Sequence, residues 1–278
     1  MALPAYTTTT EKISYYGLRV FVGAVLLFLI APILAIMPLS FNSETFFSYP
    51  MPGYSLKWYF GDAGFFTNPR WTSALYLSVI VAVAATALAT CLGTLAALGL
   101  SRSNMPGRAA IMAVLISPMI VPVIISAIGL FFFYAYTGLN GTILGIILAH
   151  TALATPFVVI TVTATLMSFD RTLMRAGASC GAPPHTVFFK VVMPLILPGV
   201  ISGALFAFVT SFDEVIVILF IGGPEQRTLP RQMFAGIREQ ISPTITAAAS
   251  VLIVFSTILL VTVELLRRRG ERLRGIKG

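Results

Sequence analysis

Apolar residues gather in six long runs along this 278-residue chain, and polar segments separate the runs. Each run reaches the roughly 20 residues that a helix needs to cross a bilayer core of about 30 Å. Lipid cannot satisfy backbone N–H and C=O groups, and the runs lack the alternation of barrel strands, so each run predicts a transmembrane α-helix. The predicted spans cover residues 18–40, 72–100, 109–134, 141–166, 199–221 and 244–266.

The composition of the chain places most of it in lipid. Hydrophobic residues make up 57% of the chain and charged residues only 10%, against about 25% charged residues in a soluble domain. We therefore expect an all-α membrane protein with a single transmembrane domain over residues 1–278. The first run is too long for the apolar core of a signal peptide, so we interpret it as a retained helix.

The basic residues predict how the chain is oriented. Six spans put both termini on one side of the membrane, and Lys and Arg mark the cytoplasmic side. The termini would share their side with 13 basic residues, against 5 on the other side, so we expect both termini in the cytoplasm. The net charge of +8 is then a signal of topology and of contact with anionic lipid, and it does not indicate nucleic-acid binding. The first group comprises Lys12, Arg19, Arg102, Arg108, Arg171, Arg175, Lys190, Arg267, Arg268, Arg269, Arg272, Arg274 and Lys277, and the second comprises Lys57, Arg70, Arg227, Arg231 and Arg238.

Two loops on the expected outer side are elaborate. Residues 41–71 are rich in aromatic side chains, which indicates a belt at the membrane interface or, alternatively, contact with an external partner. Residues 222–243 begin and end with helix-breaking Gly and Pro, and the segment MFAGIREQI between them predicts a short amphipathic helix. Arg227 and Arg231 in this loop either meet an acidic face of an external partner or are solvated.

The expected inner loop over residues 167–198 is the most informative polar segment. It contains RAGASCGAPPHTVFFKVVMP, which has room for a helix on each side of Gly181, and Arg171, Arg175 and Lys190 make it basic. A loop that only joined two spans would need a few residues. The segment therefore predicts a docking element for a cytoplasmic partner, and packing against the chain's own spans is the alternative.

The spacing within this loop resembles that of a known family. Arg175, Ala176 and Gly177 are followed after three residues by Gly181, and nine residues later Val191 to Pro194 follow. This spacing resembles the E-A-A, three residues, Gly, nine residues, I-x-L-P pattern of the permease subunit of bacterial type I ABC importers. Arg175 replaces the family's glutamate and Gly177 its second alanine, which puts any ion pair of that glutamate in doubt. Four further stretches resemble the spermidine/putrescine branch of this family: PGYSLKWY, SPMIVP, AHTALATPF and SFDEVIVILFIGGPEQRTLPRQMF.

The resemblance implies a type I importer permease fold in the bacterial cytoplasmic (inner) membrane. The implied partners are a second, non-identical permease, two ATP-binding subunits that hold Mg-ATP, and an extracytoplasmic substrate-binding protein. This chain has no GxxxxGK[ST] phosphate-binding motif, so we expect a transport subunit without catalysis or a cofactor of its own. The branch implies a polyamine or related amine as cargo, and opines, amino acids such as GABA and aminoalkylphosphonates are alternatives. An ion-coupled secondary transporter is the alternative from another class.

Two adjacent carboxylates fall inside the predicted fifth span. A charge in lipid costs roughly 2.5–3.5 kcal/mol, so such groups normally face protein or a water-filled cavity. Successive helical positions differ by about 100°, so Asp213 and Glu214 need not face the same surface. One or both would line the transport path, where negative charge favours a polyamine. The alternative is a hydrogen bond within the protein or at a subunit interface.

His150 in the predicted fourth span is a further candidate for the path, although a lone histidine there is more often neutral and hydrogen-bonded. His185 lies in the inner loop and Cys91 and Cys180 have no paired spacing, so we expect neither a metal site nor a disulfide.

Overall fold

The structure of this chain is a computed structural model. It describes residue 6 and residues 8–101, 105–167, 169–170, 172–239 and 241–273. The described residues form helices without a strand, apart from one isolated bridge between Asn42 and Tyr54. The expected orientation of the termini stays a prediction, and four of the basic residues on which it rests lie outside the described residues: Arg102, Arg171, Arg274 and Lys277.

The described helices confirm an all-α membrane protein. Five of them are long and apolar enough to cross a bilayer, and a bent pair makes up to six. The chain divides into two compact units, Met1–Asn68 with Gln240–Phe255 and Pro69–Glu239 with Ser256–Gly278. We describe each unit by itself.

The first unit contains α1 (Thr9–Leu39), α2 (Lys57–Phe60) and the beginning of α12 (Pro243–Leu273). The helix α1 begins at a capping box, because the Thr8 side chain accepts from the N–H of Glu11 and the Glu11 carboxylate accepts from the N–H of Thr8. None of its residues is buried.

The aromatic loop folds on the start of α12. Trp58 and Tyr59 pack with Ala247, and the Trp58 indole N–H donates to the carbonyl of Asn42 over 2.7 Å. The Thr244 hydroxyl donates to the carbonyl of Ala63 over 3.1 Å. The loop is therefore folded against the start of α12, and it also carries exposed aromatic rings.

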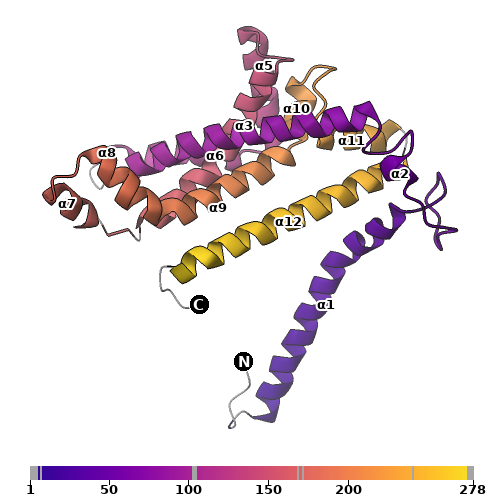
Figure 1. The fold of residues 1–278 in the computed structure, drawn as a ribbon, viewed down its shortest axis with the longest axis horizontal. Coiled ribbons are helices and arrows are strands. Elements are labelled where there is room, and N and C mark those ends of the chain that lie inside the picture. The colour runs from indigo at the N-terminus through magenta and orange to yellow at the C-terminus, as the bar shows by residue number, and fades with distance from the viewer. Residues whose placement is uncertain are drawn as a thin grey trace. The chain divides into compact units, whose positions relative to one another are not determined.

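Three long helices form the centre of the second unit, α3 (Pro69–Leu100), α6 (Ile143–Met167) and α9 (Met193–Phe212). Figure 1 shows them side by side, with α7 and α8 at one end and α10 and α11 at the other. Glycines set how closely they approach. A Cβ on Gly93 would lie 2.7 Å from the Cβ of Val158, and one on Gly203 would lie 2.9 Å from the Cα of Val158. Small residues at these crossings let the backbones pack without a hydrophobic driving force from water.

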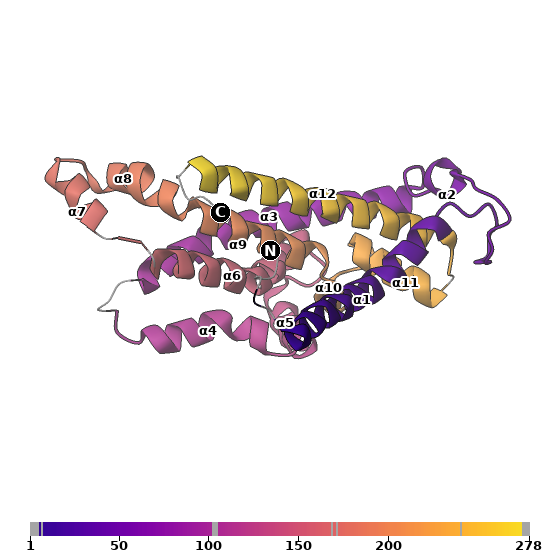
Figure 2. The same ribbon diagram turned by 90° about the horizontal axis from the view of Figure 1, so that it is seen from below.

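The predicted third span is a bent pair of helices. The helices α4 (Arg108–Ile120) and α5 (Val123–Thr137) meet at an angle of 102°. Val121 between them is extended, as a residue before proline prefers to be, and Pro122 starts the new helix. Figure 2 shows α4 beside α6 and α5 turning away from that direction.

The predicted fifth span is broken, and its helix starts earlier than expected. A continuous helix runs from Pro184 to Phe212. It comprises α8 (Pro184–Val187), a wide π-turn over Phe188–Val192 and α9. Pro194 has no N–H to reach back to the carbonyl of Lys190, which explains a widened turn at this point. After Phe212 the chain leaves the helix and resumes as α10 (Ile216–Ile221).

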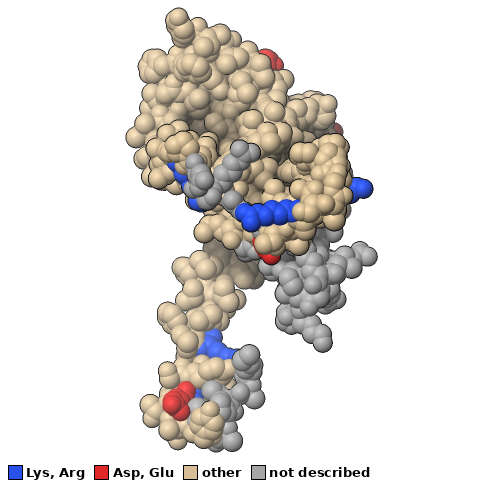
Figure 3. Space-filling model, turned by 90° about the vertical axis from the view of Figure 1, so that its left-hand side faces the viewer, with Lys and Arg blue, Asp and Glu red and all other residues tan. Residues whose placement is uncertain are grey.

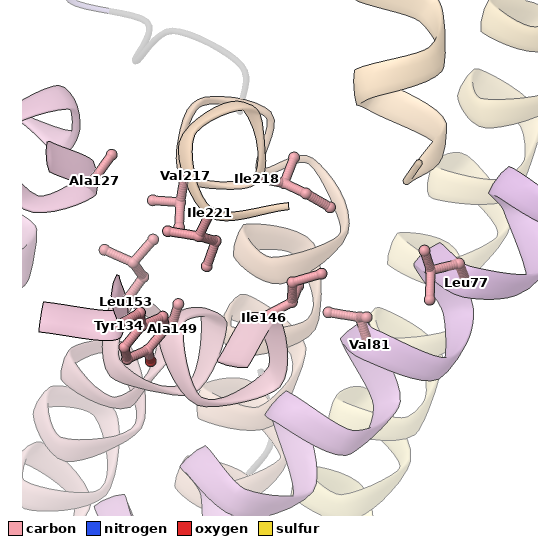
Figure 4. Packing of buried hydrophobic residues seen from close by; sticks show 10 residues of the cluster. All are labelled: Leu77, Val81, Ala127, Tyr134, Ile146, Ala149, Leu153, Val217, Ile218 and Ile221. Atoms are coloured by element: carbon pink, nitrogen blue, oxygen red, sulfur yellow. The ribbon is translucent and has the colours of Figure 1, made fainter. Parts of the chain in front are cut away.

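The helix α10 is held by an apolar core. Figure 4 shows Val217, Ile218 and Ile221 of α10 facing Ile146 and other side chains from α3, α5 and α6. The turn between α5 and α6 joins this core through a hydrogen bond of 2.9 Å from the N–H of Gly141 to the carbonyl of Ile221. Beyond α10, the amphipathic segment predicted in the third loop forms α11 (Leu229–Glu239).

Candidate functional site

The break in the fifth span separates the two carboxylates in position and in role. Asp213 is the last residue to bond back into α9, through its N–H to the carbonyl of Val209. Its side chain is exposed, and Glu214 is half-buried. The Glu214 carboxylate accepts the N–H of Val217 in the first turn of α10 over 2.8 Å. The Glu214 carboxylate therefore caps the start of α10, whereas the Asp213 carboxylate is exposed at the break.

The end of α9 adds to the negative potential at the break. The last carbonyls of a helix lack helical partners and carry a partial negative charge. Asp213 stands at this end, so a carboxylate and helix carbonyls meet at one place. Broken membrane helices use this arrangement to bind cations.

His150 of α6 fixes the same end of α9. Its side chain is 1% exposed, and its Nδ1 atom lies 3.0 Å from the carbonyl oxygen and 2.9 Å from the hydroxyl oxygen of Ser211. Within the described part of the chain the buried Nε2 atom has no hydrogen-bond partner. Ser211 precedes Asp213 by two residues, so His150 bridges α6 to the end of α9 that carries Asp213.

A row of threonines on α3 is a polar feature that the sequence analysis did not single out. The hydroxyl oxygens of Thr86, Thr90 and Thr94 are buried and, among the described residues, have no hydrogen-bond partner. The four-residue spacing puts them on one helix face, and that spacing is the signal in the sequence that would have found them.

The loop over residues 167–198 is built around Gly181. The helix α7 (Thr172–Ser179) ends there in a Schellman motif, with N–H bonds from Gly181 to Ala178 and from Ala182 to Gly177. Gly181 has a φ of +78°, which non-glycine residues seldom adopt. On the other side of the turn, α8 packs close to α7, because a Cβ on Gly177 would lie 3.2 Å from the Val187 side chain.

The start of α7 is capped by Asp170. One carboxylate oxygen accepts the N–H of Thr172 over 2.8 Å, and the other accepts its hydroxyl over 2.7 Å. These two hydrogen bonds hold the pKa of Asp170 below its usual value. The carboxylate is therefore ionised at neutral pH, and its negative charge stabilises the positive N-terminal end of α7.

The remaining residues of the family-like pattern lie on both sides of the turn at Gly181, which we call the hinge. Arg175 and Ala176 are exposed on α7, Val191 is half-buried in the π-turn, and Pro194 is exposed at the start of α9. Arg175 also lines a cavity of about 580 Å³ between the hinge and the ends of α3 and α6. Figure 3 views the end of the second unit that carries α7, where Lys and Arg side chains stand out on a largely uncharged surface.

Metal-ligating residues do not gather in the described part of the chain. No three of its His, Cys, Asp and Glu side chains are close enough to hold a metal ion. Cys91 and Cys180 are both free and exposed.

A bundle of membrane helices with a carboxylate at a broken span and an exposed loop at one end is the arrangement expected of a membrane permease subunit. The chain belongs to the family described as binding-protein-dependent transport system inner membrane component, whose model matches residues 89–272. It is therefore a component of an importer in the inner membrane, as the sequence analysis expected.

Relatives with assigned names agree with this family. The chain is 31% identical over 251 residues to the spermidine/putrescine transport system permease protein PotC of Haemophilus influenzae, covering 90% of this chain and 96% of the relative. It is 31% identical over 233 residues to the putrescine permease PotI of Escherichia coli, with 81% and 82% covered. A molybdenum transport permease, ModB of Mycobacterium bovis, is also 31% identical, over 70% of this chain and 79% of the relative.

A solved structure shares the fold. A chain of a bacterial ABC transporter that imports the acidic polysaccharide alginate matches with a TM-score of 0.72, covering 96% of this chain and 99% of that chain. The two sequences are 16% identical, so this likeness shows the permease fold alone.

Proposed function

We propose that the chain lines the transport path of an ATP-driven polyamine importer and that Asp213 contacts the cargo there. The observation that carries this proposal is the exposed Asp213 carboxylate at an interruption of the fifth span. Holding such a charge within the membrane region costs several kcal/mol in lipid, so a water-filled path is its best-supported surrounding. His150 would act there through Ser211, by keeping the end of α9 in place.

The cargo is argued from charge and from the relatives. A carboxylate beside the carbonyl end of a helix attracts an ammonium group and repels an oxyanion. The names of the relatives that cover most of this chain include spermidine and putrescine, whereas the molybdenum relative covers less of it. Both observations favour a polyamine or related amine over an anion.

The energy would come from two ATP-binding subunits that hold Mg-ATP, joined by a second, non-identical permease and an extracytoplasmic substrate-binding protein. The exposed α7 and the Gly181 turn form the proposed docking element on the cytoplasmic side. The helix after Gly181 continues without interruption to Phe212, over 29 residues. A movement of the loop would therefore reach Asp213 through one continuous helix. The family match favours this importer over the ion-coupled alternative.

The test is uptake of labelled spermidine by cells that express the complete transporter with either wild-type chain or Asp213→Asn. We expect ATP-dependent uptake that putrescine inhibits and molybdate does not, and a loss of uptake in the variant. Inhibition by GABA, an opine or an aminoalkylphosphonate, and not by putrescine, would assign that compound as the cargo instead of a polyamine. Uptake that an uncoupler abolishes at constant ATP would contradict the importer mechanism.

A further inference from the structure

Three arginines of the segment that follows α10 line one hollow. The helices α10 and α11 lie at the end of the second unit opposite α7 (Figure 1). This arginine hollow has a volume of about 430 Å³. No Asp or Glu is among its lining residues in the described part of the chain, and the Glu239 side chain is not described. Its lining residues are Leu219, Arg227, Arg231, Phe234, Ala235 and Arg238.

Two backbone carbonyls hold the Arg231 side chain in place. Its Nη1 atom donates to the carbonyls of Gly223 and Gln226 over 2.7 and 2.8 Å. Gly222 makes this approach possible, because a Cβ there would lie 2.8 Å from that Nη1 atom. The two bonds use the protons on Nη1 and leave three N–H groups of the guanidinium for a further acceptor.

The other two arginines are also oriented by the protein. Arg227 donates through Nε to the carbonyl of Pro224 over 3.1 Å, which leaves both of its Nη groups for an acceptor. The Arg238 guanidinium carbon lies 5.9 Å from the centre of the Phe234 ring. Pre-oriented guanidiniums of this kind bind phosphate through paired hydrogen bonds, at little further cost in side-chain entropy.

The charges in the hollow disfavour one another. Burial lowers the pKa of Arg231, and the nearby charge of Arg227 lowers it further. Both effects mean that the positive form is held at a cost. An anion in the hollow would offset this cost, since opposite charges at close range in a partly buried place attract strongly.

The apolar part of the lining selects among anions. Leu219 belongs to α10, at the end of the fifth span, and is 38% exposed, while Phe234 is 39% exposed. The hollow thus combines guanidiniums with an open apolar surface beside a membrane helix. A phospholipid offers a phosphate and an alkyl chain together, whereas a protein carboxylate offers only the charge. We propose that the arginine hollow binds the phosphate headgroup of an anionic phospholipid, with the acyl chain along Leu219 and Phe234.

The experiment measures lipid retention by native mass spectrometry. The full-length chain, purified with the subunits that accompany it, is titrated with dioleoyl phosphatidylglycerol and separately with dioleoyl phosphatidylcholine. We expect preferential retention of phosphatidylglycerol, weakened roughly tenfold in Arg227→Gln and in Arg238→Gln, since each removes a charge-assisted bond. Arg231 is left intact because it holds the loop. Arg108→Gln, which removes an exposed charge at the start of α4, away from the hollow, should retain phosphatidylglycerol as the wild type does.

Four results would overturn the proposal. Equal retention of the two lipids would remove the role of negative charge, and equal retention by all variants would place the lipid elsewhere. Displacement by inorganic phosphate at the same concentration would indicate a site for a free anion. If Arg227→Gln keeps its lipid but loses stimulation by the substrate-binding protein, the hollow belongs to a carboxylate of that protein.

Discussion

Asp213 and Glu214 are adjacent in sequence, yet their carboxylates have different surroundings. Glu214 is occupied by the N–H of Val217, while Asp213 is exposed at the end of α9. The apolar pattern of the sequence could not make this distinction, because it predicted one unbroken helix through both residues.

Neutralising the two carboxylates should therefore have unequal effects on transport. Asp213→Asn removes the charge that we propose for the cargo, and we expect spermidine uptake to fall about tenfold or more, the range of a charged hydrogen bond. Glu214→Gln keeps an oxygen that accepts the N–H of Val217, so uptake should stay within about twofold of wild type. Initial uptake rates, normalised to the amount of protein in the membrane, provide the measurement. Equal losses in the two variants would contradict the separation of roles.

The contact between His150 and Ser211 should contribute to stability. His150→Phe leaves a buried carbonyl without its partner, which costs about 1–3 kcal/mol, so the protein should unfold at a lower temperature in detergent. Ser211→Ala keeps the backbone carbonyl that His150 contacts and should have the smaller effect. A thermal unfolding curve read by size-exclusion chromatography distinguishes them. A His150→Phe variant as stable as the wild type would show that this contact does not stabilise the fold.

At the scale of elements, the hinge at Gly181 is set by backbone conformation alone. A Cβ at this position would meet nothing within 4 Å, so a larger side chain would have space. The obstacle to substitution is the φ of +78°, which a β-branched residue adopts only at a cost of about 1–2 kcal/mol or more.

This distinction gives a matched pair of variants. Gly181→Val should disturb the turn between α7 and α8 and uncouple ATP hydrolysis from uptake in the complete transporter. Asn tolerates the left-handed conformation, so Gly181→Asn should keep both activities close to wild type. Parallel assays of ATP hydrolysis and spermidine uptake test the pair. Coupled transport by the Val variant would refute the role of the hinge.

The crossing of α6 and α9 depends on space rather than on conformation. Gly203→Ala would bring a Cβ within 2.9 Å of the Cα of Val158, and overpacking of this kind costs about 1–3 kcal/mol. Gly129→Ala on α5 meets nothing within 4 Å and should leave stability unchanged or slightly raised. Unfolding temperatures of the two variants provide the comparison, and equal values would show that the helices separate readily.

At the scale of the whole molecule, hydrophobic runs predicted the helical membrane fold because lipid enforces helices wherever the chain is apolar. Interruptions were harder to predict. Pro122 stands at the bend of the third span, but the break after Phe212 has no proline, and the polar pair at 213–214 was its only signal in the sequence. The contact between His150 and Ser211 joins residues 61 positions apart, which a local pattern cannot reveal. The helix of the fifth span also begins at Pro184, well before the predicted start at residue 199, because it continues through the π-turn before Pro194.

The bare surface of α1 has a consequence for how the transporter is built. No residue of this 31-residue helix is buried, so its apolar side chains are left for lipid to cover. Exchanging α1 for an unrelated apolar helix of equal length should thus spare the folding of α3 to α11 while changing which assemblies the protein enters.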